Sequence, residues 1–169
     1  NFTLIFTPQA PTVPGTPLAS NATVQIVFPN LSVGHPKNPY TFNIVANSVA
    51  PEIHVLGQLN GTGVPPTIDI LDGATPPSVS NGTDFGTTTT GTSVVHSFRI
   101  ENRGTTNLNL TSAISFSGTN ASDFTIISPV SNTITSILSE QFLDIKVRFS
   151  PQGIGSRQAT LNIANNDQT

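Results

Sequence analysis

The sequence of 169 residues contains no cysteine, no methionine and no tryptophan, and it has few charged residues. Without cysteine, neither a disulfide framework nor thiolate chemistry is available, which argues against a small disulfide-stapled ectodomain of the eukaryotic kind. The missing methionine includes the initiator, so we expect a processed or internal piece of a longer protein.

Charged residues make up only 9% of the chain, against roughly a quarter in an average soluble domain. The six basic residues form no cluster in the sequence, and they are Lys37, Arg99, Arg103, Lys146, Arg148 and Arg157. Nucleic-acid binding and polybasic membrane attachment both need a concentrated positive field, so we expect neither. No apolar run approaches the ~20 residues of a transmembrane helix, and no signal peptide is expected in this piece.

Ser, Thr, Asn, Gly and Pro take the place of charged residues, so hydroxyl and amide groups hydrate the expected surface. Such a surface is common in secreted repeat proteins and unusual in cytosolic enzymes. Together with the absence of cysteine, it fits a bacterial surface protein whose core is large enough to fold without disulfides. We therefore expect an extracellular, cell-surface or secreted location.

Alternation of apolar and polar residues with period two runs through the sequence between Gly, Pro and Asn turns. The longest example is residues 143–149, where Leu143, Ile145 and Val147 are expected on one face with Phe149. Shorter examples contain Phe98 and Ile100, Leu108 and Leu110, and Phe124 and Ile126, with a turn expected at residues 101–106. The fourteen prolines and many β-branched residues disfavour helices. The pattern predicts an all-β fold, an immunoglobulin-like antiparallel β-sandwich.

Two segments near the start of the chain resemble two segments near its end. Residues 2–9 match residues 145–152, and both end in Pro-Gln. Residues 21–26 match residues 158–163 in the same way, and a longer Pro-rich loop at residues 8–17 absorbs the difference in spacing. The paired inward positions are Phe2 with Ile145, Leu4 with Val147, Phe6 with Phe149, and Val24 with Leu161. Two successive strands that match around the same turn indicate a domain-length internal repeat.

A series of short motifs accompanies this repeat from residue 51 onward. The motifs are Pro-Glu-Ile at 51–53, Ile-Asp-Ile-Leu-Asp-Gly at 68–73, Gly-Thr-Asp-Phe-Gly at 82–86, Phe-Arg-Ile-Glu-Asn-Arg-Gly at 98–104, Leu-Asn-Leu at 108–110, Asp-Phe at 123–124, Val-Arg-Phe-Ser-Pro at 147–151 and Ala-Asn-Asn-Asp at 164–167. Together they resemble the choice-of-anchor D family, bacterial immunoglobulin-like tandem repeats related to the ASH (Hydin-type) domains. The resemblance implies a stalk-like, adhesive or structural role and no catalytic residues.

The resemblance also implies a final strand, Asn-Pro-Tyr-x-Phe and onward, which stands at residues 38–44 instead of after residue 169. We therefore expect residues 1–50 to be the C-terminal strands of one repeat, and residues 51–169 to be the next repeat without its final strand. A sandwich without an edge strand exposes unpaired backbone groups, so another copy or a neighbouring repeat is expected to complete it. The residues expected to take part in this strand completion are Phe2, Leu4, Phe6, Tyr40, Phe42, Ile44, Ala159, Leu161 and Ile163.

The leading functional prediction is a structural repeat or subunit of an extracellular filament, stalk or adhesin, assembled head to tail. The simpler form of this prediction is a segment of a long repeat protein. The alternative from another class is a carbohydrate- or protein-binding module of a secreted protein, with a surface ligand that the sequence does not identify. The absence of tryptophan and the single tyrosine, Tyr40, offer little aromatic platform for a sugar.

No arrangement of residues predicts an enzyme, a metal site or a cofactor. His35, His54 and His96 are far apart in the sequence and are interpreted as ordinary surface or strand-end residues. Asp69 and Asp72 with Asp84 are candidate calcium ligands, although such acids more often cap turns. Seven Asn-x-Ser/Thr sequons and four consecutive threonines at residues 87–90 are candidate glycosylation sites, and the sequons begin at Asn1, Asn21, Asn30, Asn60, Asn81, Asn109 and Asn120.

Overall fold

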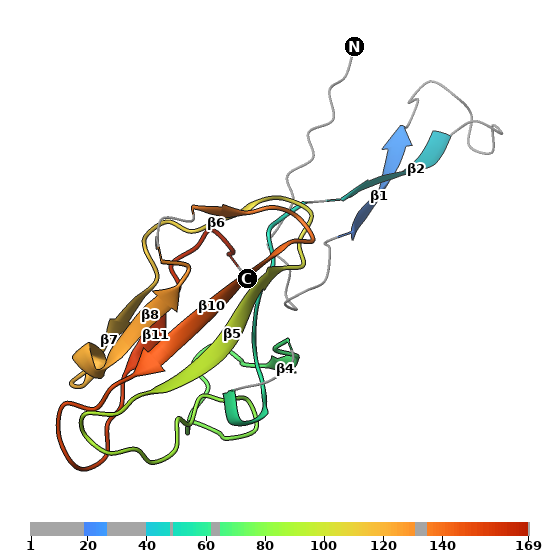
Figure 1. Ribbon diagram of the computed structural model, residues 1–169. Helices are drawn as coiled ribbons and strands as arrows, with labels where there is room; N and C mark the ends of the chain where they lie inside the picture. Colours follow the sequence, from blue (N-terminus) through green and yellow to red (C-terminus); the bar gives the residue numbers. More distant parts are fainter. Residues whose placement is uncertain (1–18, 27–39, 48, 62–64, 131–134, 169) are drawn as a thin grey trace. The chain divides into compact units, whose positions relative to one another are not determined.

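The computed structural model describes residues 19–26, 40–47, 49–61, 65–130 and 135–168 (Figure 1). The chain divides into two compact units, which are considered separately: unit 1 comprises residues 1–49 with residue 169, and unit 2 comprises residues 50–168. Phe2, Leu4, Phe6 and His35 lie outside the described residues.

Unit 1 contains one antiparallel pair of strands, β1 (Ala19–Ile26) and β2 (Tyr40–Asn47). Their register places Ile26 opposite Tyr40 and Ala19 opposite Asn47, so all eight residues of each strand are paired. An isolated two-stranded ribbon is marginally stable in water. The described part of unit 1 therefore has strand pairing but no second layer of sheet to pack on.

The main element of unit 2 is a five-stranded antiparallel sheet (Figure 1). In spatial order its strands are β4 (Ile68–Asp69), β3 (Ile53–Gly57), β5 (Val94–Asn102), β10 (Phe142–Phe149) and β8 (Phe124–Ser128). The two long central strands, β5 and β10, carry the clearest alternation in the sequence. On β10, Ile145, Val147 and Phe149 are buried while the residues between them are exposed, as predicted.

Two small antiparallel sheets complete unit 2. One pairs β7 (Ser115–Ser117) with β11 (Thr160–Asn162), and the other pairs β6 (Leu108–Asn109) with β9 (Ser136–Ile137). The helical turns among the described residues are two 3-10 segments, η1 (Leu59–Gly61) and η2 (Ala121–Asp123). None of the helical segments in the described ranges has the length and apolar character needed to span a membrane.

The hydrophobic core of unit 2 contains residues from the large sheet and from the small sheets. The strands β5 and β10 contribute Phe98, Ile100, Ile145 and Val147. The strands β6 and β9 contribute Leu108 and Ile137, and the segment between β6 and β7 contributes Leu110 and Ile114. Residues of β7 and β11 and the residue after β11 pack against this cluster, namely Phe116, Leu161 and Ile163. The prediction of an all-β antiparallel sandwich is confirmed, whereas the immunoglobulin-like arrangement and the tandem repeat stay predictions.

The turn expected at residues 101–106 begins later than predicted. Glu101 and Asn102 still belong to β5, where Asn102 lies opposite Ile53 of β3. The strand continues because the backbone of Asn102 also pairs with the segment before β10, donating to the Gln141 carbonyl at 2.9 Å and accepting from Glu140 N at 2.9 Å. The polar character of these residues indicated a turn, but tertiary pairing keeps them extended.

Candidate functional site

Strand β11 lies at the edge of its sheet. It pairs with β7 on one side, with Leu161 opposite Phe116, and the ladder continues to an isolated bridge between Leu110 and Asn165. Within the described part of the chain, no second strand pairs with β11. Since an edge strand presents a row of backbone N–H and C=O groups, β11 is a site where a further strand can be added.

The two faces of β11 differ in polarity, as the sequence predicted. Leu161 is half-buried against the core, and Ala159 and Ile163 on either side of β11 are half-buried as well. Thr160 and Asn162 are exposed on the other face, where Asn162 Nδ2 donates to Ser117 Oγ at 3.0 Å. The strand therefore already has an inward and an outward face, which restricts the register of any strand added beside it.

Side-chain hydrogen bonds fix the chain after β11 to the start of β3 and to β6. Asp167 Oδ2 accepts from Ile53 N at 2.9 Å, and Asn165 Oδ1 accepts from Asp167 N at 2.8 Å. Asn166 Oδ1 accepts from Asn109 N at 2.6 Å. The Ala-Asn-Asn-Asp motif was interpretable from the sequence only as a family feature, and its role in holding β11 in place was not predicted.

The Asn102 side chain connects the residue before β3 to the segment after β5 and to β9. It is buried, and its Oδ1 accepts from Gly104 N at 3.0 Å and from Glu52 N at 3.2 Å. Its Nδ2 donates to the carbonyl oxygens of Thr106 at 2.7 Å and Ile137 at 3.0 Å. One side chain thus bonds to four backbone groups and holds the entry of the chain into β3.

An ion pair at the opposite end of β11 fixes the preceding loop. The Asp123 side chain is fully buried, and its Oδ2 accepts from Arg157 Nε at 2.6 Å. The Asp123 carbonyl also accepts from Ser150 N at 2.7 Å. The hydrogen bond from Arg157 holds the pKa of Asp123 below its usual value, although burial acts in the opposite direction, and the same bond raises the pKa of Arg157.

This pair predicts a stability difference that depends on pH. A carboxyl group with a lowered folded-state pKa stabilises the fold above its unfolded pKa of about 3.9, and the contribution is lost as pH falls through the folded value. The Arg157→Gln variant leaves the Asp123 carboxylate buried without its cation, so its melting temperature is expected to be lower than wild type at pH 7. The deficit should shrink as pH falls from about 4 through the lowered folded-state pKa of Asp123, because below that value the carboxyl group is neutral in both proteins.

Melting curves followed by circular dichroism between pH 7 and pH 2 test this expectation. Arg148→Gln is the matched control, since Arg148 is exposed on β10 and has no acidic partner within ion-pair distance among the described residues. The small decrease in melting temperature that this control causes should not vary with pH. A deficit for Arg157→Gln that is the same at pH 7 and pH 2 would show that the ion pair does not act as described.

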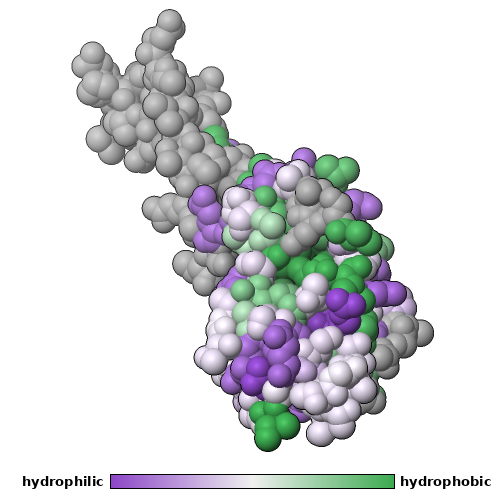
Figure 2. Space-filling view, turned by 60° about the vertical axis from the view of Figure 1, so that its left-hand side comes forward, coloured by the Kyte–Doolittle hydropathy of each residue, from purple (hydrophilic) through white to green (hydrophobic). Residues whose placement is uncertain are grey.

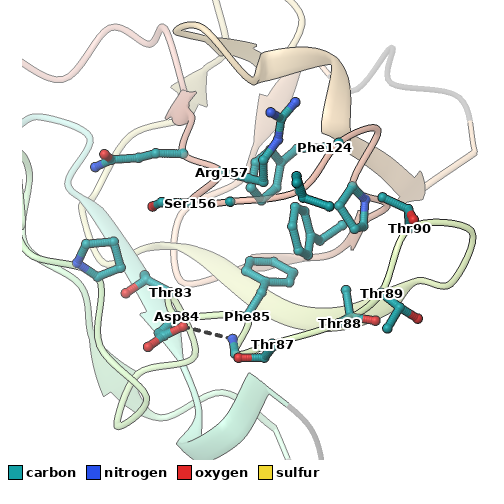
Figure 3. A pocket seen from close by; sticks show the side chains of 18 of the residues that line it. Thr83, Asp84, Phe85, Thr87, Thr88, Thr89, Thr90, Phe124, Ser156 and Arg157 are labelled. Carbon is teal, nitrogen blue, oxygen red and sulfur yellow. Dashed lines mark hydrogen bonds between the residues drawn. The ribbon is translucent and has the colours of Figure 1, made fainter.

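The loops near the Asp123–Arg157 pair surround an open pocket of about 1130 Å³ (Figure 3). Its apolar wall contains Phe85, Phe124 and Phe149, with Phe85 edge-on to Phe124 at 5.6 Å between ring centroids. Thr87–Thr90 supply hydroxyl groups on another side, as Figure 3 shows. Among the described residues that line the pocket, Asp84 and Arg157 carry charge, and none is a histidine or a cysteine.

The pocket lining offers contacts to a ligand but no recognisable reaction centre. Arg157 is already paired with Asp123, and Asp84 Oδ1 accepts from Gly86 N at 2.8 Å (Figure 3), which caps a turn. Ser156 has no histidine or lysine beside it in the lining that could activate its hydroxyl group. The phenyl rings and threonine hydroxyl groups of the lining are suited to contact a partly apolar, hydroxyl-rich group.

The interpretation of His96 as a surface or strand-end residue was wrong. Its side chain is buried within β5 and stacks on Phe85 with 4.1 Å between ring centroids. Its Nδ1 lies 2.6 Å from the Gly82 carbonyl oxygen, which can only accept, so Nδ1 carries the hydrogen. The residue is part of the packing because its ring fills the space beside η1 and the pocket wall.

His54 and the candidate calcium ligands form no metal cluster. His54 is half-buried on β3, with Arg103 Nη1 at 3.0 Å and Asp69 Oδ1 at 3.5 Å from its Nδ1. Asp72 and Asp84 are exposed. In the residue ranges covered by the structure, no group of three His, Cys, Asp or Glu side chains is placed to hold a metal ion.

Unit 2 exposes several large hydrophobic side chains, and Figure 2 shows hydrophobic surface among polar residues on one face. The most exposed are Val130, Ile154, Leu71, Leu59 and Leu138. Leu59 lies in η1, and the other four lie in four different segments between strands. Phe142, at the start of β10, is covered in part by the Arg99 guanidinium, which lies 3.6 Å from the ring centroid and pairs with Asp144 at 2.6 Å.

The predicted assembly residues that the structure describes lie on two strands. Tyr40, Phe42 and Ile44 are alternate residues of β2, and Leu161 lies within β11 with Ala159 and Ile163 beside it. The structure brings Tyr40, Phe42 and Ile44 opposite β1, and it places Ala159, Leu161 and Ile163 along the edge strand of unit 2. Their role in assembly stays a prediction.

Fold and site together define an antiparallel β-sandwich in which β11 is one of the strands that have a neighbour on one side only among the described residues. Comparison with protein-family models, with curated proteins and with solved structures finds no match to this chain. The resemblance to the choice-of-anchor D family therefore depends on the motifs in the sequence alone.

Proposed function

We propose that this chain is a structural subunit or repeat of an extracellular filament, stalk or adhesin, joined to other copies or repeats by strand complementation. The observation that supports the proposal best is the edge of β11, where half-buried apolar residues adjoin an edge with no strand neighbour in the described chain. Edges of this kind are normally paired, covered or charged in stable proteins. The three residues of β11 carry no charge.

The described sites support a structural role over a catalytic one. The 165–167 segment and the Asp123–Arg157 pair hold the two ends of β11, and Asn102 holds the entry of the chain into β3, each through buried or half-buried hydrogen bonds. The chain thus uses its buried polar groups to fix a strand edge. The low content of charged residues and the hydroxyl- and amide-rich surface favour an extracellular setting.

The pocket in Figure 3 supports a second candidate function, a carbohydrate- or protein-binding module of a secreted protein. Its phenyl rings and threonine hydroxyls match the mixed character of a sugar or of a peptide. Phe85, however, is stacked on His96 on one face, so only part of that ring is available to a ligand.

Electron microscopy and sedimentation velocity of the 169-residue chain distinguish the two functions. The structural function predicts that the sedimentation coefficient rises with protein concentration and that fibres with a regular axial repeat form. Globular particles, with a sedimentation coefficient that does not change up to millimolar concentration, would contradict assembly and would favour the binding module.

A further inference from the structure

The partner of β11 and its register can be derived from the other strand pair of the chain. Residues 21–26 of β1 correspond in sequence to residues 158–163, so Val24 corresponds to Leu161. In unit 1, Val24 lies opposite Phe42 of β2. If β11 takes the strand that its counterpart β1 takes, Phe42 comes to lie opposite Leu161.

The hydrophobic pattern agrees with this register. With Phe42 opposite Leu161 in an antiparallel pair, Tyr40 falls opposite Ile163 and Ile44 falls opposite Ala159. Three apolar pairs then lie on the inward face of β11, and the polar residues of both strands meet on the outward face. A shift by one residue would turn Thr41 and Asn43 toward the core, so the pattern fixes which face of β2 points inward, and the correspondence with the β1–β2 pair fixes the register on that face.

The full length of β2 from the same chain does not fit this register, because the link from β2 to unit 2 is short. Asn47, the last residue of β2, would lie level with Ser156, beside the Arg157–Asp123 pair and the end of the large sheet that contains Val94. Ala50 is held at the other end of β5, where its carbonyl accepts from Thr105 N at 3.0 Å. Residues 94–102 of β5 span about 26 Å, whereas the three residues from Asn47 to Ala50 span at most about 11 Å.

Transfer of β2 to another copy is energetically reasonable. In unit 1, β2 belongs to a two-stranded sheet, which is marginally stable by itself. On β11 it would become the third strand of the β7–β11 sheet and would cover Leu161 and Ile163, which are only half-buried. Burial of apolar area is favourable, so pairing with β11, which packs on the core of unit 2, is favoured over pairing with β1 alone.

We propose that β2 of a second copy pairs antiparallel with the open edge of β11, with Phe42 opposite Leu161. This inference rests on the proposed structural function and adds to it the donor strand, the acceptor strand and the register between them.

Disulfide cross-linking tests the register, and the absence of native cysteine makes every disulfide a designed one. The Phe42→Cys and Leu161→Cys variants are mixed, oxidised and separated on a non-reducing gel. Directly opposite residues of an antiparallel pair satisfy disulfide geometry, so a mixed dimer is expected at about tenfold higher yield than in the control. The matched control mixes Thr41→Cys with Leu161→Cys, because Thr41 lies in the same strand but on the opposite face.

A mixed dimer that forms equally well in the control pair would overturn the register, as would cross-linking between Phe42→Cys chains alone. A labelled peptide with the sequence of residues 38–47 separates this inference from the proposed function. Saturable binding of the peptide to wild-type chain, and its loss in Leu161→Lys that still folds by circular dichroism, would support the β11 acceptor even where no fibres are seen. Fibres that form without the Phe42–Leu161 cross-link would show that assembly uses another surface and that the inference is wrong.

Discussion

Asn102→Ala is expected to lower the free energy of unfolding by about 3–5 kcal/mol, because each buried polar group left without a partner costs about 1–3 kcal/mol. The Asn102 side chain bonds to the backbone of Glu52, Gly104, Thr106 and Ile137, and the residue is 1% exposed. Alanine has no polar atom to replace these bonds, and a site this buried has too little room for water to replace all of them. The loss is a large part of the 5–15 kcal/mol, roughly, that stabilises a typical domain.

Urea denaturation followed by circular dichroism measures this loss, since the chain has no tryptophan for fluorescence. Asn109→Ala is the matched control: Asn109 is exposed, and its bond to Asn166 uses the backbone N–H, which the substitution keeps. The control should change the free energy of unfolding by less than about 0.5 kcal/mol. A loss of less than about 1 kcal/mol for Asn102→Ala would contradict the assigned role of this side chain.

The long strands of unit 2 could be predicted because their burial follows their sequence with period two. Ile145, Val147 and Phe149 alternate with charged or polar residues and lie in a central strand, where one face is buried along its whole length. The two-residue strands β4 and β9 carry no such signal, whereas Leu108 and Leu110 indicated a strand at β6. Two residues cannot show a period, so their pairing depends on where the longer strands bring them.

The strand β11 could be predicted from the sequence, but the side chains that hold it in place could not. The alternation of Ala159, Leu161 and Ile163 with polar residues is enough by itself to indicate a strand. The bond between Asp167 and Ile53 joins residues 114 positions apart, and the Asp123–Arg157 bond joins residues 34 apart. Such partners are chosen by the tertiary fold, and a single polar side chain in the sequence does not reveal them.

His96 shows how sequence reasoning failed at a buried polar residue. It precedes Phe98 and Ile100 by two and four residues in β5, so the alternation places it on their inward face, although Val95 beside it is also apolar. Histidine is intermediate between the buried and the exposed residue types, so its identity did not strengthen that indication. The missing information was its environment, a glycine on one side and an aromatic ring on the other, which the fold assembles from residues 61 and 85.

Gly61→Ala is expected to lower the free energy of unfolding by about 3–4 kcal/mol, with about 1–2 kcal/mol from backbone strain and the rest from overpacking. Gly61 ends η1 with φ +66°, and a Cβ atom there would overlap the His96 ring. The ring cannot retreat easily, because His96 is 4% exposed, stacks on Phe85 and is bonded to the Gly82 carbonyl.

Gly73→Ala separates the two contributions, since Gly73 has the same φ of +66° but no atom within 4 Å of the added Cβ. This control should cost only about 1–2 kcal/mol. In a His96→Ala background the overlap is removed, so Gly61→Ala should then cost about as much as Gly73→Ala, a coupling of about 2 kcal/mol in a double-mutant cycle. Equal costs for Gly61→Ala and Gly73→Ala in the wild-type background would show that the ring moves freely and that His96 is not held by its neighbours.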